Sequence, residues 1–239
     1  KLDLVEYPYE EVEPRIKAAF QNSARVERSE IAAARYLKQS KTTLETTRPF
    51  VNNAFVLNEV FKDVMDEART DAMTINDCMG TIMGMSKTTA CLPLSLMNDD
   101  GYLAFCESDY VVIPSGSLLH YICGLPVFLN DPTYPHDGIM TLAHCTSPRK
   151  MDGKKNERAR ILTHFESDYG AAPKVEMKLG QITTNLVPDF NCKKWVGFAG
   201  TIVGNPFLDI CRSQVDVKVH GDANALLDPP ATPRLEWAD

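Results

Sequence analysis

The 239-residue sequence lacks both the long apolar runs of membrane-spanning proteins and the clustered basic residues of nucleic-acid-binding proteins. No apolar run approaches the ~20 residues that a membrane helix requires, and the N-terminus has no charged-then-apolar signal pattern. The formal net charge is −7, and the basic residues between Arg149 and Arg160 are mixed with Asp152 and Glu157, which predicts a solvated loop. We therefore expect a cytoplasmic protein that binds neither membranes nor nucleic acid.

Cysteine and glycine are present, but they lack the spacings that would indicate metal, disulfide or nucleotide sites. The seven cysteines are scattered and odd in number, without C-x-x-C or paired His/Cys spacing. This favours reduced thiols over a disulfide framework or a structural zinc site. Gly80 and Gly84 do not satisfy G-x-G-x-x-G, and no G-x-x-x-x-G-K-[ST] loop occurs. Nucleotide-dependent chemistry is not indicated.

The first half of the chain alternates helical and strand patterns, which is typical of an α/β fold. Residues 1–14 are expected to be extended. The first expected helix covers residues 15–38, with a break or bend around 21–29, the second covers 50–68, and a third kinks or starts at Pro114. The expected strands are 71–77, 103–107 and one that ends at Asp131. Over residues 1–136 we predict an open, mostly parallel sheet with flanking helices.

The second half reads as a mainly antiparallel β domain over residues 137–239. After a proline-containing loop at 132–138, the expected strands are 139–144, 160–165, 174–179, 181–187, 196–203 and 214–220. The proline-rich segment at 228–233 cannot belong to a central strand or to the interior of a helix.

Two carboxylates follow two successive strands of the predicted parallel sheet. If the strands are parallel neighbours, a right-handed crossover places Glu107 and Asp131 at the same carboxyl edge, where open α/β folds bind ligands. Paired carboxylates can hold a hard divalent ion, and His144 could add an imidazole.

Each member of this group also has a purely structural interpretation. Glu107 could cap a helix, Asp131 lies in an Asn-Asp-Pro turn signal, and a histidine on an apolar strand is more often structural than a ligand. Cys145 beside His144 would point to the opposite face of the strand, which argues against a thiol nucleophile.

Four ordered segments resemble the L-fucose isomerase-like sugar isomerases. They are TINDCMG (74–80), ACLPLSLMNDDGYLAFCESD (90–109), GLPVFLNDP (124–132) and LAHCTSPRKMDG (142–153), and the resemblance spans roughly residues 71–222. It implies an α/β metal-binding domain followed by a β-barrel-like domain, an additional N-terminal α/β domain and a further C-terminal histidine ligand. We expect the last two to lie outside these 239 residues.

The resemblance also implies a set of site residues and a cofactor. Glu107 and Asp131 would be the paired Mn²⁺ ligands and proton carriers, with Mg²⁺ or another divalent cation as alternatives. His144 matches the histidine ligand of the related L-arabinose isomerases. Family members assemble into oligomers whose neighbouring subunits help complete the sugar pocket, so we expect a homo-oligomer. We also predict that Asp77, Arg149 and His164 bind the substrate.

The function expected on these grounds is a metal-dependent aldose-ketose isomerase. It would act on a pentose or a deoxyhexose, through an enediol intermediate. Two alternatives stay open at this point. One is a non-catalytic carbohydrate-binding or assembly module of the same fold, and the other is a metal-dependent sugar lyase or aldolase.

Overall fold

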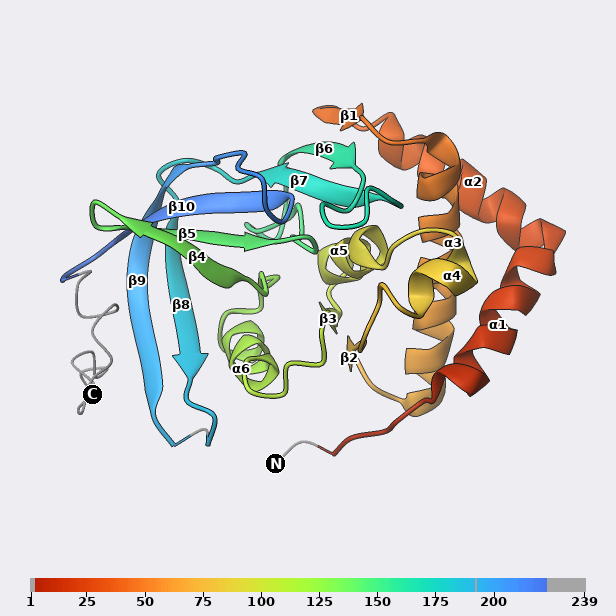
Figure 1. Cartoon of the computed structure of the whole chain (residues 1–239), viewed down its shortest axis with the longest axis horizontal. Coiled ribbons are helices and arrows are strands. Elements are labelled where there is room, and N and C mark those ends of the chain that lie inside the picture. The colour runs from red at the N-terminus through yellow and green to blue at the C-terminus, as the bar shows by residue number, and fades with distance from the viewer. Residues whose placement is uncertain (1–2, 192, 223–239) are drawn as a thin grey trace.

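A computed structural model describes residues 3–191 and 193–222, in which a group of helices packs beside β-sheets (Figure 1). The helices are α1 (Tyr9–Gln21), α2 (Ser23–Leu37), α3 (Arg48–Ala68), α4 (Ile82–Ser86), α5 (Cys91–Asp99) and α6 (Ile113–Cys123). Helices α1, α2 and α3 lie at one end, and a five-stranded antiparallel sheet lies at the other (Figure 1). None of the described helices is both long and apolar enough to cross a bilayer.

The chain breaks between the first two helices at Asn22, inside the predicted interval. The Asn22 side chain accepts a hydrogen bond from Arg25 N at 3.0 Å and so caps α2. The prediction that residues 1–14 are extended is wrong from Tyr9 onward. Although α1 contains Pro14, its face with Val12 and Ile16 is buried, and this packing outweighs the backbone hydrogen bond that proline cannot make.

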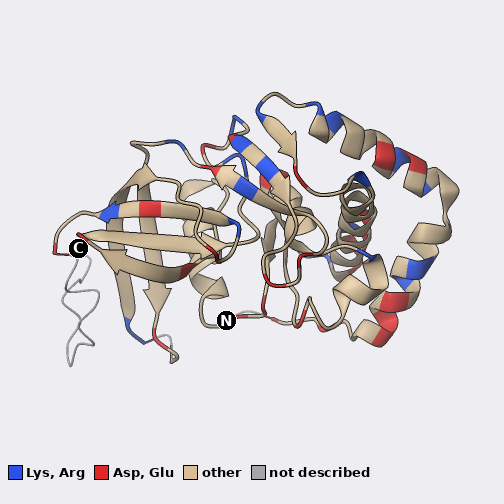
Figure 2. Cartoon of the chain, turned by 45° about the horizontal axis from the view of Figure 1, so that its top comes forward, with Lys and Arg blue, Asp and Glu red and all other residues tan. Residues whose placement is uncertain are grey.

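Helix α3 confirms the predicted helix over residues 50–68 and forms the centre of the helical part. Its first turn contains Pro49, and residues recurring at threes and fours along it are buried, among them Val51, Leu57 and Met65. Both Lys or Arg and Asp or Glu lie along the outer helices α1 and α2 (Figure 2). Arg25 of α2, for example, lies 2.5 Å from Asp63 of α3.

The predicted mostly parallel sheet is much smaller than expected. Within the described residues, β2 (Ala72–Thr74) and β3 (Leu103–Phe105) form a two-stranded parallel sheet. The segment 125–130 forms no strand, because Pro126 lacks a backbone donor; its apolar side chains Val127 and Leu129 pack against β3 without pairing. The mixed α/β class is therefore right, but the extent of parallel pairing is wrong.

The strands from β5 onward overlap the predicted segments, whereas β4 was not predicted. The strands are β4 (Asp131–His136), β5 (Ile139–His144), β6 (Arg158–Leu162), β7 (Ala172–Glu176), β8 (Ile182–Pro188), β9 (Trp195–Gly204) and β10 (Ser213–Val219). Five of them pair in the order β4-β5-β10-β9-β8. Because β4 and β8 are the edges of this sheet, the described residues form no closed barrel, and the barrel-like expectation is not met. The proline-rich segment 228–233 lies outside the described residues.

The segment expected to be a loop at 132–138 is instead the edge strand β4 and a tight turn. Proline is tolerated at a sheet edge, and the pairing of β4 with β5 shifts register between Pro132 and Tyr134. Asp137 and Gly138 turn the chain with φ of 48° and 76°. The predicted division between residues 136 and 137 falls within this hairpin.

A third sheet joins the two halves of the chain. Strand β1 (Thr42–Leu44) pairs in parallel with β6, which pairs antiparallel with β7. One hydrophobic core includes Ala33 and Val51 from the helices together with Val175 and Val215 from the strands. This shared packing holds the helices and the strands of the second half together, and the candidate site lies at the ends of β3 and β5.

Candidate functional site

Glu107 follows β3 in an unusual backbone conformation. Glu107 and Ser108 have φ of 69° and 47°, a left-handed region that side chains with a Cβ seldom adopt. The Ser108 N–H donates to Thr74 Oγ1 at 3.0 Å and holds this turn against β2. Consecutive strained residues at a strand end are typical of functional sites.

Neither Glu107 nor another side chain caps α6. The backbone N–H groups of Val111 and Val112, in the turn before α6, donate to Asp109 Oδ1 at 2.9 and 3.1 Å. Among the described residues, no backbone N–H of this turn donates to the Glu107 carboxylate, which lies beside His144 instead. Its position is therefore explained by the site and not by α6.

Asp131 reaches Glu107 by a route that differs from the predicted one. Asp131 begins β4 instead of ending a parallel strand, and it pairs with Ala143 in the antiparallel register with β5. The next residue of β5 is His144, its last. The β4–β5 hairpin therefore places Asp131 beside His144, and the parallel crossover invoked from the sequence plays no part.

The structure brings Glu107, Asp131 and His144 together. Each offers one ligand atom, and these atoms all lie within 4.8 Å of one another. Glu107 Oε1 is 3.3 Å from His144 Nε2. The His144 side chain is 3% exposed, whereas that of Glu107 is 60% exposed, so an imidazole lies at the base of the group and a carboxylate lies at its open side.

The two ring nitrogens of His144 differ sharply in their environment. Nδ1 lies 3.0 Å from Thr146 Oγ1, which fixes the orientation of the ring. Nε2 is buried and makes no aligned hydrogen bond to any described residue, despite its proximity to Glu107. An unsatisfied buried polar atom costs ~1–3 kcal/mol, and a bound cation would provide the missing partner. Two carboxylates and an imidazole fit a divalent ion such as Mn²⁺.

The charges of the group shift its three pKa values. The pKa of Glu107 is lowered by His144. Burial lowers the pKa of His144, but the adjacent Glu107 carboxylate more than offsets this, and the net pKa is above 6.5. Partial burial raises the pKa of Asp131. Protons and a cation therefore compete for the same atoms of His144 and Asp131, and cation binding is favoured as pH rises.

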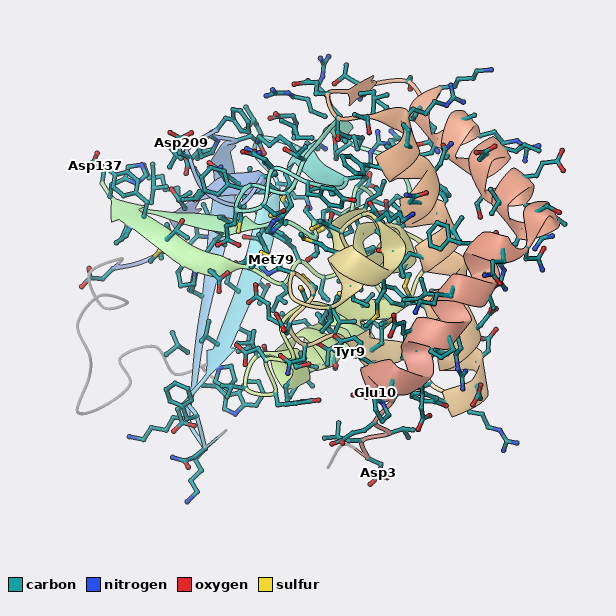
Figure 3. All side chains as sticks on the ribbon, turned by 45° about the vertical axis from the view of Figure 1, so that its right-hand side comes forward. Asp3, Tyr9, Glu10, Met79, Asp137 and Asp209 are labelled. Carbon is teal, nitrogen blue, oxygen red and sulfur yellow. The ribbon has the colours of Figure 1, made fainter. Side chains whose placement is uncertain are left out.

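The three residues line a cavity of about 230 Å³. Acids, imidazoles and thiols predominate in its lining, which comprises Asp77, Cys78, Met79, Cys91, Cys106, Glu107, Asp131, His144, Cys145, Thr146, His164, Glu166 and Cys211. Met79 lies between the helical part and the five-stranded sheet (Figure 3). The cavity is smaller than the ~300–1,000 Å³ of sites for drug-sized ligands and suits a small polar molecule.

Two of the three residues predicted to bind substrate line this cavity. Asp77 Oδ1 accepts a hydrogen bond from Gly80 N at 3.1 Å, so this carboxylate also shapes its own turn. His164 Nδ1 lies 3.1 Å from Ser167 Oγ, and its Nε2 lies 3.7 Å from Glu166 Oε2. Burial lowers the pKa of His164, which favours a neutral imidazole.

Arg149, the third predicted substrate-binding residue, lies elsewhere. It is 0% exposed and does not line the cavity. Its guanidinium donates to Glu157 O at 2.8 and 3.0 Å and to Gln39 Oε1 at 3.1 Å, and it lies 5.2 Å from the centre of the Tyr36 ring. The solvated-loop prediction is wrong for this residue, and its role is to hold the loop onto α2.

Sequence reasoning missed Thr146 and the thiols that line the cavity. Thr146 lies two residues after His144, but only the fold shows that its hydroxyl reaches the ring. The prediction that Cys145 points away from His144 is wrong, because β5 ends at His144 and the chain bends at Cys145, so both line one cavity. The cysteines come from separate segments, and no local spacing could indicate their proximity.

Comparison of the chain with models of protein families and with curated protein sequences finds no match.

Proposed function

We propose that this protein is a metal-dependent aldose-ketose isomerase that acts on a pentose or a deoxyhexose. The observation that carries the proposal is the grouping of Glu107, Asp131 and His144 within 4.8 Å, with the unpartnered His144 Nε2 at the base of a small polar cavity. The resemblance of four ordered segments to sugar isomerases supports the choice of reaction.

The chain's own residues divide the work of the reaction between them. His144, held by Thr146, and the carboxylates of Glu107 and Asp131 would bind the divalent ion. Mn²⁺ bound there would polarise the carbonyl and hydroxyl oxygens of the sugar. The buried ring of His144 keeps one side of the group closed, while the carboxylates lie where an open-chain sugar can reach them.

Proton transfer is assigned to the two acids. The carboxylate of Glu107 or Asp131 takes the proton from C2 of the open-chain aldose, and the electron pair forms the double bond of a cis-enediol. The same proton is then delivered to C1, while the hydroxyl proton on O2 moves to O1, which leaves a ketose. General acid-base transfer of this kind contributes ~10²–10⁴ in rate.

The proposal is tested with Glu107→Gln and Asp131→Asn, and with Glu67→Gln as the matched control. Glu67 makes an exposed ion pair with Arg15 on α1 and does not line the cavity. Glu67→Gln therefore makes the same carboxylate-to-amide change outside the site. We expect Mn²⁺-loaded protein to isomerise at least one of a panel of pentoses and deoxyhexoses, followed by NMR. Both site variants should lose ~10²-fold or more in rate and the control should lose little. Wild-type activity in both site variants would contradict the assignment.

The same assay separates the two alternative functions. A lyase or aldolase would cleave a carbon-carbon bond of the sugar and release two smaller products in place of a ketose. A non-catalytic carbohydrate-binding module would bind sugar in calorimetry without Mn²⁺ and would convert none of it.

We also propose that copies of the chain associate, as the resemblance implies, and complete the sugar pocket together. Sedimentation or light scattering of the protein with and without Mn²⁺ tests this. A monomer that isomerises sugar at full rate would contradict the need for assembly.

A further inference from the structure

The cavity contains a second group of side chains that could hold a metal ion, beside the first. Cys91, Cys145 and His164 each offer one ligand atom, and these atoms lie within 4.8 Å of one another. All three residues are buried, at 3, 3 and 7% exposure. None of them belongs to the carboxylate group with His144.

A fourth thiol lies next to this group. Cys211 packs against the cluster of Cys91, Cys145 and Ala172. It lines the same cavity, and it precedes β10, whose first residue Ser213 pairs with His144. Three thiols and an imidazole from four separate segments of the chain therefore line one cavity.

The arrangement of His164 is that of a metal ligand with an outer partner. Its Nδ1 contacts the Ser167 hydroxyl at 3.1 Å, which leaves Nε2 as the ring nitrogen available for a cation. Metal-bound histidines usually have their second nitrogen fixed in this way. Cys91 is the first residue of the nine-residue helix α5.

Buried thiols can also pack simply as small apolar side chains, and Cys91, Cys145 and Ala172 do form one apolar cluster. That interpretation does not account for the imidazole nitrogen of His164 within reach of two sulfur atoms, nor for the cavity that the same atoms line. Thiolate and imidazole ligands in fourfold combination are typical of Zn²⁺, whereas carboxylates favour Mn²⁺ or Mg²⁺.

We propose that Cys91, Cys145, Cys211 and His164 form a Zn²⁺ site next to the Glu107, Asp131 and His144 group. The cavity would then hold two cations of different chemistry, a thiolate-bound one towards α5 and an oxygen-bound one towards β4. On binding, each thiol loses its proton to solvent and forms a sulfur-metal bond, with no change of oxidation state. The proposal does not depend on the isomerase function.

The test is to load the metal-free, reduced full chain with Co²⁺ as a spectroscopic substitute for Zn²⁺. We expect a thiolate-to-cobalt charge-transfer band and intense tetrahedral d-d bands, abolished by added Zn²⁺. Cys91→Ser and Cys145→Ser should each weaken Co²⁺ binding by at least about 100-fold. This is the largest loss expected when only an outer partner of a metal ligand is removed, and loss of a ligand itself should cost no less. Cys123→Ser is the matched control, because this exposed thiol ends α6 and does not line the cavity. Glu107→Gln should retain the band.

Bands that persist in Cys91→Ser and Cys145→Ser, or that vanish in Glu107→Gln, would overturn the proposal. X-ray absorption of the Zn²⁺-loaded wild-type chain covers the case in which a serine variant fails to fold. Sulfur neighbours at ~2.3 Å from zinc are expected, and a shell of oxygen and nitrogen alone would refute the site. Failure of sugar isomerisation with these sulfur neighbours present would count against the proposed function and leave the zinc site standing.

Discussion

Thr146→Val removes the hydroxyl that orients the imidazole of His144 and leaves the rest of the cavity intact. The two side chains differ by one hydroxyl in place of a methyl group, so the shape of the site is retained. In the wild-type chain Thr146 Oγ1 lies 3.0 Å from His144 Nδ1, and both residues are 3% exposed. In the variant neither ring nitrogen has a protein hydrogen-bond partner, because Nε2 already lacks one.

The magnitude follows from these contacts. A buried imidazole nitrogen left without its partner costs ~1–3 kcal/mol, so we expect the free energy of unfolding to fall by about that amount. With a cation at Nε2, Nδ1 carries the proton and donates it to the hydroxyl. Loss of this outer contact should weaken Mn²⁺ binding by ~10–100-fold.

Thr141→Val is the matched control for this variant. Thr141, which lies in β5, is likewise a buried threonine, and its hydroxyl donates to Asp216 Oδ1 at 2.6 Å, away from the cavity. It should lower the free energy of unfolding similarly and leave Mn²⁺ affinity unchanged. Titration of Mn²⁺, followed by electron paramagnetic resonance, and chemical denaturation measure the two effects. Equal Mn²⁺ affinity in Thr146→Val and wild type would refute the ligand role assigned to His144.

Three further predictions concern pKa values and backbone geometry. In metal-free Glu107→Gln the pKa of His144 should fall, because burial then acts without an opposing carboxylate, and NMR titration of the ring measures it. Burial raises the pKa of Asp99 from 3.8 to about 6, so the folded state holds this proton more tightly and stability from this group falls as pH rises through that window. In Asp99→Asn this pH dependence of the free energy of unfolding, up to about 3 kcal/mol, should be absent. Chemical denaturation at pH 4 and at pH 7 measures it. Gly80→Ala should lower the melting temperature, because its Cβ would overlap a carboxylate oxygen in the same turn, whereas Gly84→Ala meets nothing within 4 Å and should not.

Sequence patterns predicted the long elements well, because their periodicity reflects their own burial. Helix α3 and the strands from β5 to β10 follow from apolar spacing alone. The errors occur where tertiary packing opposes a local signal. Pro14 lies within a helix whose apolar face is buried, and Pro132 lies in an edge strand that needs no donor at that position.

The candidate site was found for a partly wrong reason. Glu107, Asp131 and His144 do come together, but an antiparallel hairpin and not a parallel crossover brings Asp131 into place. A sequence pattern specifies that an acid follows an apolar segment, whereas strand pairing depends on contacts distant along the chain. For the same reason, the meeting of Cys91 and Cys145 could not be read from spacing.

We propose that Glu107, Asp131 and His144 bind one divalent cation, and anomalous diffraction from crystals of the protein soaked in Mn²⁺ would locate it. We expect one manganese peak within coordination distance of both carboxylates and of His144 Nε2. A cavity without such a peak at saturating Mn²⁺, or a peak bound only by carboxylates with His144 turned away, would contradict it.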